Sequence, residues 1–261
     1  MLLASQDKKS EFHSLVPSVT QNLAEWQVVS ARLPGGSPAD MQALAQKLVT
    51  IYADKEGMIF PFADKVVMMQ RILATADSGT FKSELEQKLP GRGYTFILRQ
   101  MTADVLKQVE NLFVESGEAP DSLFTHRLAR AGNSVLVIDD DFFYRTLLRR
   151  ECENYAQVHQ SEDGKDAAKL YRDVNPDIVF LDIHLPSTQG LAILDQLTQL
   201  DFDAFIIMLS ADTSRHNVLE SIKKGAAGIL KKPPESGKLL RLFRTCPTFK
   251  KSGELKESAK I

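Results

Sequence analysis

The sequence predicts an α/β protein in which a doubly wound, five-stranded parallel sheet forms the C-terminal half and a smaller α+β domain precedes it. From Ser134 onward, five short apolar runs alternate with five amphipathic stretches within about 110 residues, which is the order of a parallel sheet with a helix after each strand. The apolar runs do not alternate with polar residues, as expected where helices cover both faces of a sheet. The first half lacks this regularity, so we expect it to form a domain of its own.

The ten elements of the C-terminal half can be placed from this pattern. We expect strands at 134–139, 156–162, 178–183, 204–210 and 228–233. We expect helices at 142–154, 164–174, 191–200, 214–225 and 235–245. The fourth of these helices ends on Gly225, a residue suited to a helix C-cap.

In the first half, the expected elements follow the order strand, helix, strand, strand, helix, strand, with one more helix after them. They cover 26–33, 37–53, a hairpin at 57–72, 79–90, 94–101 and 102–115. This is the order of a split βαβ, or ferredoxin-like, sandwich. We therefore divide the chain into an N-terminal domain at 1–115, a polar linker at 116–133, a C-terminal domain at 134–247 and a disordered polar tail at 248–261.

Composition excludes several classes of protein. With 43% hydrophobic and 25% charged residues, the chain is typical of globular proteins. Basic and acidic residues number 14 and 15 up to Asn133, and 18 and 19 beyond it, so neither half has the basic excess of a DNA-binding surface. The two cysteines, Cys152 and Cys246, fit no metal-ligand pattern, and no apolar run suits a signal peptide or a membrane span. We expect a soluble cytoplasmic protein without membrane insertion.

Polar side chains stand where the expected parallel strands end. The first strand ends in Asp139, Asp140 and Asp141, and the third ends at Asp182. The fourth ends at Ser210, and the fifth at Lys232. Ligands collect outside the carboxyl ends of strands in such sheets. Clustered carboxylates with room for water suit Mg²⁺, and a lysine and a hydroxyl beside them suit phosphoryl transfer to a carboxylate.

Four motifs carry a resemblance to a known family. The segments "VLVIDDD", "IVFLDIHLP" with Gly190 after it, "IIMLSAD" and "GAAGILKKP" follow one another in the order and spacing of the receiver domain of two-component response regulators. The resemblance covers residues 134 to about 245 and implies a flavodoxin-like receiver fold. It also implies that Asp182 is phosphorylated by a histidine kinase or a phosphotransfer protein.

The same resemblance implies the roles of the surrounding residues. Asp140, Asp182 and the backbone carbonyl of His184 would hold Mg²⁺, with Asp139 helping through water. Lys232 would pair with the phosphoryl group and Ser210 would hydrogen-bond it.

Other interpretations stay open for some of these positions. Asp141 could simply favour the start of a helix. The assignment of Lys232 rather than Lys231 rests on the proline that follows it, and the side chain of His184 is expected to be exposed. Members of this family commonly carry an aromatic residue three positions before the lysine, where this chain has Ile229, so the switch position differs.

The output of the first domain is less defined. It has no Gly-Gly-Asp/Glu-Glu-Phe turn of a diguanylate cyclase and no P-loop, and Tyr94 and Phe96 are expected to be core aromatics rather than an RNA-binding pair. We expect a non-enzymatic response regulator that switches contacts of its N-terminal domain with a downstream protein. A receiver-gated cyclase-like or nucleotide-binding domain and a transcription regulator are the alternatives. We expect the amphipathic helices at 39–53 and 103–115 to pack on the sheet, and the alternative is that either of them presents a dimer or partner surface.

Overall fold

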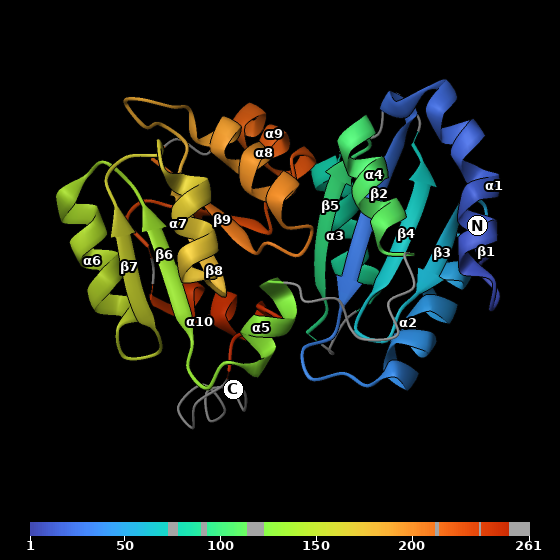
Figure 1. Cartoon of the computed structure of the whole chain (residues 1–261), viewed down its shortest axis with the longest axis horizontal. Coiled ribbons are helices and arrows are strands. Elements are labelled where there is room, and N and C mark those ends of the chain that lie inside the picture. The colour runs from blue at the N-terminus through green and yellow to red at the C-terminus, as the bar shows by residue number, and fades with distance from the viewer. Residues whose placement is uncertain (73–77, 90–92, 114–122, 212–213, 235, 251–261) are drawn as a thin grey trace. The chain divides into compact units, whose positions relative to one another are not determined.

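The computed structural model describes the chain except for residues 73–77, 90–92, 114–122, 212–213, 235 and 251–261. It divides into two compact units, Met1–Glu115 and Ser116–Ile261. Each unit contains one five-stranded sheet (Figure 1).

The N-terminal unit has the split βαβ topology that the sequence predicts. Its strands are β1 (Leu2–Leu3), β2 (Trp26–Arg32), β3 (Gly57–Pro61), β4 (Val66–Arg71) and β5 (Thr95–Gln100), in the spatial order β1-β3-β4-β2-β5. Strand β2 pairs antiparallel with both β4 and β5, and β3 pairs antiparallel with β4. The helices α2 (Pro38–Ile51) and α3 (Ser78–Lys88) make the two crossovers. The ferredoxin-like order is therefore confirmed for β2 to β5, and β1 is an added edge strand parallel to β3.

Capping chemistry sets the start of two helices in this unit. The side chain of Ser37 accepts a hydrogen bond from the backbone N–H of Asp40, whose carboxylate accepts one from Ser37 in return, and Pro38 occupies the first helical position of α2. Thr102 caps α4 (Ala103–Asn111) by accepting from the N–H of Val105 at 3.2 Å.

The sequence did not predict α1 (Lys8–Gln21), which packs on the sheet. Phe12 of α1 is buried and stacks on Phe113, which follows α4, with the ring centroids 4.7 Å apart. Both rings meet the edge of Phe60 in β3. An aromatic cluster therefore covers this part of the sheet. Phe96 of β5 is buried as predicted, whereas Tyr94 is partly exposed.

The second unit is a doubly wound parallel sheet, as predicted. Its strands are β6 (Ser134–Ile138), β7 (Gln157–Ser161), β8 (Ile178–Asp182), β9 (Ile206–Ser210) and β10 (Gly228–Lys231), in the spatial order β10-β9-β8-β6-β7. Its helices are α5 (Leu123–Ala129), α6 (Phe142–Cys152), α7 (Ala167–Val174), α8 (Gly190–Leu200), α9 (Arg215–Lys223) and α10 (Ser236–Thr245). All four strand pairings are parallel, and the order is the flavodoxin-like one.

Apolar side chains cover both faces of this sheet. On one face, residues of β6, β8 and β9 pack with α7 and α8, including the buried Tyr171, Leu194 and Leu197. Elsewhere in the unit, Phe243 of α10 is buried and stacks on Phe249, with the centroids 4.7 Å apart. The unbroken apolar strands of the sequence follow from this double covering.

Two of the predicted boundaries need correction. The expected linker at 116–133 contains α5, whose Arg127 is 1% exposed and donates to the Tyr171 hydroxyl and to Asp201 at 3.2 and 2.8 Å. A buried guanidinium needs such partners, and they lie far away in the sequence. The expected tail at 248–261 begins too early, because Phe249 is buried and Lys250 hydrogen-bonds Asn133. The rest of that tail lies outside the described residues.

Candidate phosphoacceptor and cation site

The parallel sheet brings the predicted polar residues together at one edge. Asp139 and Asp140 follow β6, Asp182 ends β8, and Ser210 ends β9. The backbone N–H of Lys232, just after β10, donates to the carbonyl of Ser210 at 2.9 Å. Because parallel strands end at the same edge of a sheet, residues separated by more than 90 positions become neighbours.

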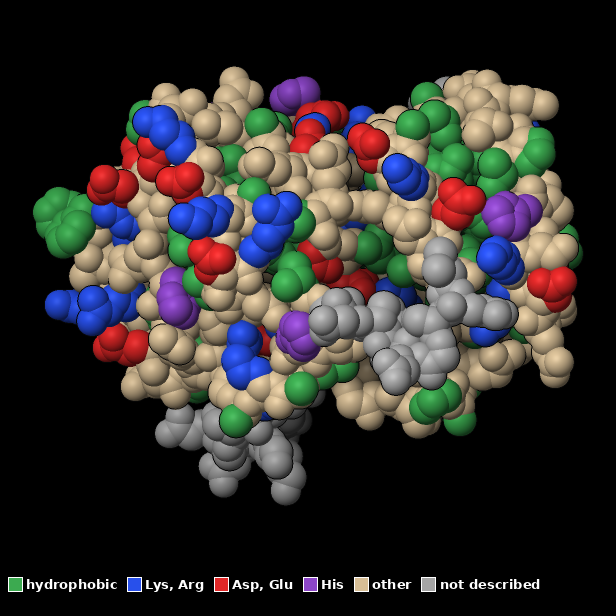
Figure 2. Space-filling view, in the orientation of Figure 1, with side chains coloured by type: hydrophobic (Ala, Val, Ile, Leu, Met, Phe, Trp, Pro, Cys, Tyr) green, Lys and Arg blue, Asp and Glu red, His purple; other side chains and the backbone are tan. Residues whose placement is uncertain are grey.

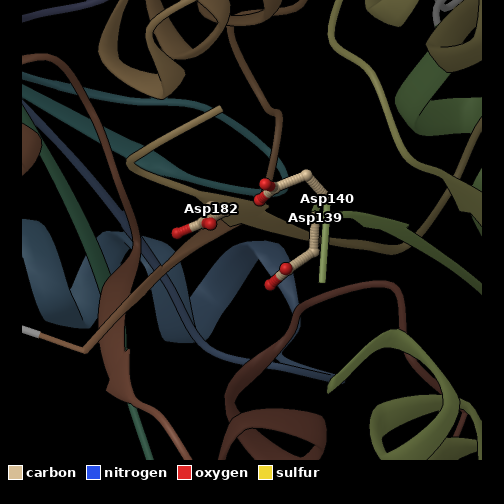
Figure 3. A group of neighbouring side chains, drawn as sticks. All are labelled: Asp139, Asp140 and Asp182. Atoms are coloured by element: carbon tan, nitrogen blue, oxygen red, sulfur yellow. The ribbon is translucent and has the colours of Figure 1, made fainter. Parts of the chain in front are cut away.

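Three carboxylates face a common space from β6 and β8. One oxygen each from Asp139, Asp140 and Asp182 lies within 4.8 Å of the others (Figure 3). Asp139 and Asp182 are buried, and Asp140 is exposed. An all-oxygen donor set with one side open to water fits the preference of Mg²⁺ for a few carboxylates and several waters. These residues therefore fit the cation that the sequence predicts.

Lys232 counters the charge of the two buried carboxylates. Its Nζ lies 2.6 Å from Oδ2 of Asp139 and 2.9 Å from Oδ2 of Asp182. Burial by itself would lower the pKa of Lys232, but the hydrogen bonds to the two carboxylates outweigh it, so the pKa of this lysine is raised. Burial raises the pKa of Asp139, against the opposing effect of the ammonium. Of the two adjacent lysines, Lys231 is exposed, and Lys232 places its ammonium beside Asp182.

The turn from β6 into α6 holds the acidic segment rigidly. The carboxylate of Asp141 caps α6 by accepting from the N–H groups of Phe143 and Tyr144 at 2.9 and 3.1 Å. This is the helix-start role that the sequence left open for Asp141. The N–H of Asp141 donates to Oδ1 of Asp139 at 3.0 Å, and the Arg145 guanidinium donates to the Asp139 carbonyl at 2.6 Å. Backbone and side chain of Asp139 are both fixed.

Gly190 packs against the backbone of the candidate acceptor. A Cβ atom at Gly190 would lie 1.9 Å from the carbonyl oxygen of Asp182, so a side chain cannot fit there without moving the strand end. The N–H of Gly190 donates to the carbonyl of Ile183 at 3.0 Å. The glycine in the sequence motif thus lets α8 start directly beside Asp182. The side chain of His184, between them, is exposed as expected.

Ser210 and Ile229 also lie where the sequence places them. Ser210 is buried at the end of β9, and Ile229 pairs with Met208 in the neighbouring strand. Ile229 is partly buried and packs against the core that includes Met208. The side chain of Ile229 is therefore an aliphatic group at the edge of the core.

A cavity lies on the open side of the site, and the helix that follows β6 exposes two aromatic side chains. A cavity of about 600 Å³ lies beside Asp140, lined in addition by Ile183 to Pro186, Gln189, Leu191, His216 and Asn217. On α6, Phe142 and Phe143 are 64% and 82% exposed. Hydrophobic side chains protrude over this helix in Figure 2.

Two residues of this site were not predicted from the sequence. Tyr144 and Arg145 lie in the first turn of α6, and both are buried. Tyr144 places its ring against Lys232, and Arg145 holds the Asp139 carbonyl. A tyrosine and an arginine near a helix start give no sequence signal for such contacts, because the partner of Tyr144 is 88 positions away.

Comparison with known proteins agrees with this geometry. Residues 135–244 match the family model described as the response regulator receiver domain. The chemotaxis protein CheY of Listeria monocytogenes is 37% identical over 108 residues, which cover 41% of this chain and 91% of that relative. This chain belongs to the response regulator receiver family.

Further relatives of this receiver are similar over the same half of the chain. The chemotaxis protein CheY of Thermotoga maritima is 33% identical over 104 residues, covering 39% of this chain and 87% of the relative. The nitrate/nitrite response regulator protein NarL of Escherichia coli is 28% identical over 111 residues, covering 41% of this chain and 51% of NarL. A solved CheX–CheY–BeF₃–Mg²⁺ complex from Borrelia burgdorferi is 30% identical, with a TM-score of 0.41, covering 46% of this chain and 90% of that one.

The receiver match leaves the N-terminal unit outside it, since it begins at residue 135. No helix within the described residues has the length and apolar character needed to cross a membrane.

Proposed function

We propose that this protein is a two-component response regulator in which Asp182 accepts a phosphoryl group from a histidine kinase or a phosphotransfer protein. The observation that carries the proposal is the placement of a buried carboxylate at a strand end, 2.9 Å from the Lys232 ammonium and beside two further carboxylates. Such a set can position and stabilise a phosphoryl group during transfer to oxygen.

The transfer step follows from these groups. An oxygen of the Asp182 carboxylate forms a bond to the donor's phosphorus, and the phosphorus–nitrogen bond to the donor histidine breaks, its electron pair staying on nitrogen. The product is an acyl phosphate. Mg²⁺, when bound, neutralises charge on the phosphoryl oxygens. Asp140, Asp182 and the His184 carbonyl would hold it, with Asp139 helping through water. Lys232 would pair with a phosphoryl oxygen, and the Ser210 hydroxyl would donate to another.

We assign the output to the N-terminal unit, acting through protein–protein contacts. Its sequence lacks the nucleotide-binding turns of cyclases and P-loop proteins, and the Phe12–Phe60–Phe113 cluster covers part of its sheet. A second candidate is a nucleotide-binding output domain, favoured by the split βαβ topology that nucleotide cyclases share.

A phosphoryl mimic tests the receiver step on the full chain. We expect beryllofluoride with Mg²⁺ to raise the melting temperature of the wild type but not of Asp182→Asn, because the mimic needs the acceptor carboxylate. Asp173→Asn is the matched control, since Asp173 is an exposed carboxylate on α7 of the same unit. An equal response of Asp182→Asn and the wild type would contradict the proposal.

Hydrogen exchange tests the output. We expect the mimic to change amide protection within Met1–Glu115 of the wild type and to leave Asp182→Asn unchanged. If the receiver responds to the mimic and amide protection within Met1–Glu115 stays unchanged, the proposed output through the N-terminal unit is contradicted. Tight binding of a purine nucleotide to the full chain would favour the second candidate.

A further inference from the structure

Lys232 contacts an aromatic ring as well as two carboxylates. Its Nζ lies 4.7 Å from the centroid of the Tyr144 ring, within the range of a cation–π interaction. Tyr144 is 7% exposed, and the Lys232 side chain is 15% exposed. Such interactions are strongest where water is excluded, so this contact restrains the ammonium more than a surface contact would.

The ring is the partner of Lys232 that phosphorylation does not alter. A lysine has a flexible stem and a point charge, so its position depends on what surrounds the ammonium. On the proposed function, on which this inference rests, Asp182 becomes an acyl phosphate and a cation competes for the oxygens of Asp139. Both ion pairs of Lys232 then change. The Tyr144 ring carries no charge to be altered and keeps its contact.

The fold ties the position of this ring to the acidic segment. The N–H of Tyr144 donates to the carboxylate of Asp141 at 3.1 Å, and the N–H of Asp141 donates to Asp139 at 3.0 Å. The ring therefore belongs to the same capped turn that holds Asp139. We propose that Tyr144 is a positioning residue whose ring face holds the Lys232 ammonium beside Asp182 before and after phosphoryl transfer.

The ring and not the hydroxyl carries this role. The Tyr144 hydroxyl is buried and has no hydrogen-bond partner among the residues that the structure describes. Phenylalanine would keep the ring face, so Tyr144→Phe is the conservative variant. Tyr144→Leu removes the ring, and Tyr144→Met removes it while filling the space with a flexible side chain.

An NMR experiment on the full chain tests the contact itself. Protons on the lysine carbon next to Nζ should be shifted upfield by the ring in the wild type and in Tyr144→Phe, with the signal assigned by its loss in Lys232→Arg. The shift should vanish in Tyr144→Leu and Tyr144→Met. Absence of an upfield shift in the folded wild type would overturn the proposal without reference to phosphorylation.

A rate measurement tests the consequence. With acetyl phosphate and Mg²⁺, we expect Asp182 to be labelled roughly tenfold more slowly in the Leu and Met variants, and within about twofold of the wild type in Tyr144→Phe. Equal labelling rates in the wild type and the three Tyr144 variants would overturn the positioning role. The role would also be overturned if Tyr144→Phe were slowed as much as the Leu and Met variants. Failure of the proposed function would look different, since the wild type itself would not be labelled at Asp182.

Discussion

The ammonium of Lys232 lies 2.9 Å from the carboxylate of Asp182, and the same ammonium also pairs with Asp139. The ammonium therefore neutralises negative charge on these two carboxylates that would otherwise attract a bound cation. Two unit charges about 4 Å apart interact by about 1 to 4 kcal/mol at the dielectric of water or of a protein surface. Removing the ammonium should therefore strengthen cation binding.

We expect Lys232→Met to bind Mg²⁺ roughly tenfold more tightly than the wild type, since about 1.4 kcal/mol corresponds to a factor of ten. Isothermal titration calorimetry measures the affinity. Lys231→Met is the control, because Lys231 is an exposed neighbour, and its affinity should stay at the wild-type value. Weaker binding in Lys232→Met would show that the lysine does not compete with the cation.

The ion pairs of Lys232 should make stability depend on alkaline pH. The pKa of Lys232 in the folded protein is raised above its ordinary value of 10.5, because its bonds to Asp139 and Asp182 outweigh burial. Folding thus favours the protonated lysine. Its contribution is fully present below the unfolded pKa and is lost as the pH rises through the folded one.

We subtract the unfolding free energy of Lys232→Met from that of the wild type. We expect this difference to be constant near pH 8 and to decrease above about pH 10.5, because the wild type loses the contribution of the protonated lysine. Urea titrations of both proteins across this range measure it. Taking the difference cancels the titration of the tyrosines and of the other lysines, which both proteins share. A difference that does not change with pH would contradict the raised pKa.

The buried pair between Arg127 and Asp201 should be needed for the stability of the receiver unit. Their side chains are 1% and 8% exposed and lie 2.8 Å apart. Arg127→Met would leave a buried carboxylate without its ion-pair partner, at a cost of roughly 3–5 kcal/mol. Arg149→Met is the control, because Arg149 pairs with Glu153 on the surface and such pairs contribute at most about 1 kcal/mol. Denaturant unfolding measures the loss of unfolding free energy in both variants, and we expect a larger loss in Arg127→Met. Equal losses would contradict the prediction.

Gly190 should tolerate no side chain. In Gly190→Ala the added methyl would meet the Asp182 carbonyl oxygen at 1.9 Å, so the strand end or the start of α8 must move. We expect a loss of about 1–3 kcal/mol, together with slower labelling of Asp182. Gly237→Ala adds the same methyl in α10 where nothing lies within 4 Å, and it should be neutral or stabilising by up to about 1 kcal/mol. If Gly190→Ala were as stable as the wild type, the close approach of Gly190 to the Asp182 carbonyl would be contradicted.

The sequence by itself determined the parallel sheet and its edge. Apolar runs of strand length with polar residues at their ends are local features, and the topology of such sheets brings these ends together. The site around Asp182 and Lys232 could therefore be placed from the sequence. The split βαβ order of the first unit was predictable for the same reason, because strand and helix periodicities are local.

Only the tertiary structure decided what surrounds these elements. Helix α5 had the composition of a linker, and its burial depends on partners of Arg127 that lie 44 and 74 residues away. The Tyr144 ring meets Lys232 through a contact that no local pattern encodes. Helix α1 was not predicted, and its buried Phe12 packs against Phe60 and Phe113, which lie far along the chain. Burial is a property of the whole fold, whereas periodicity is a property of the segment.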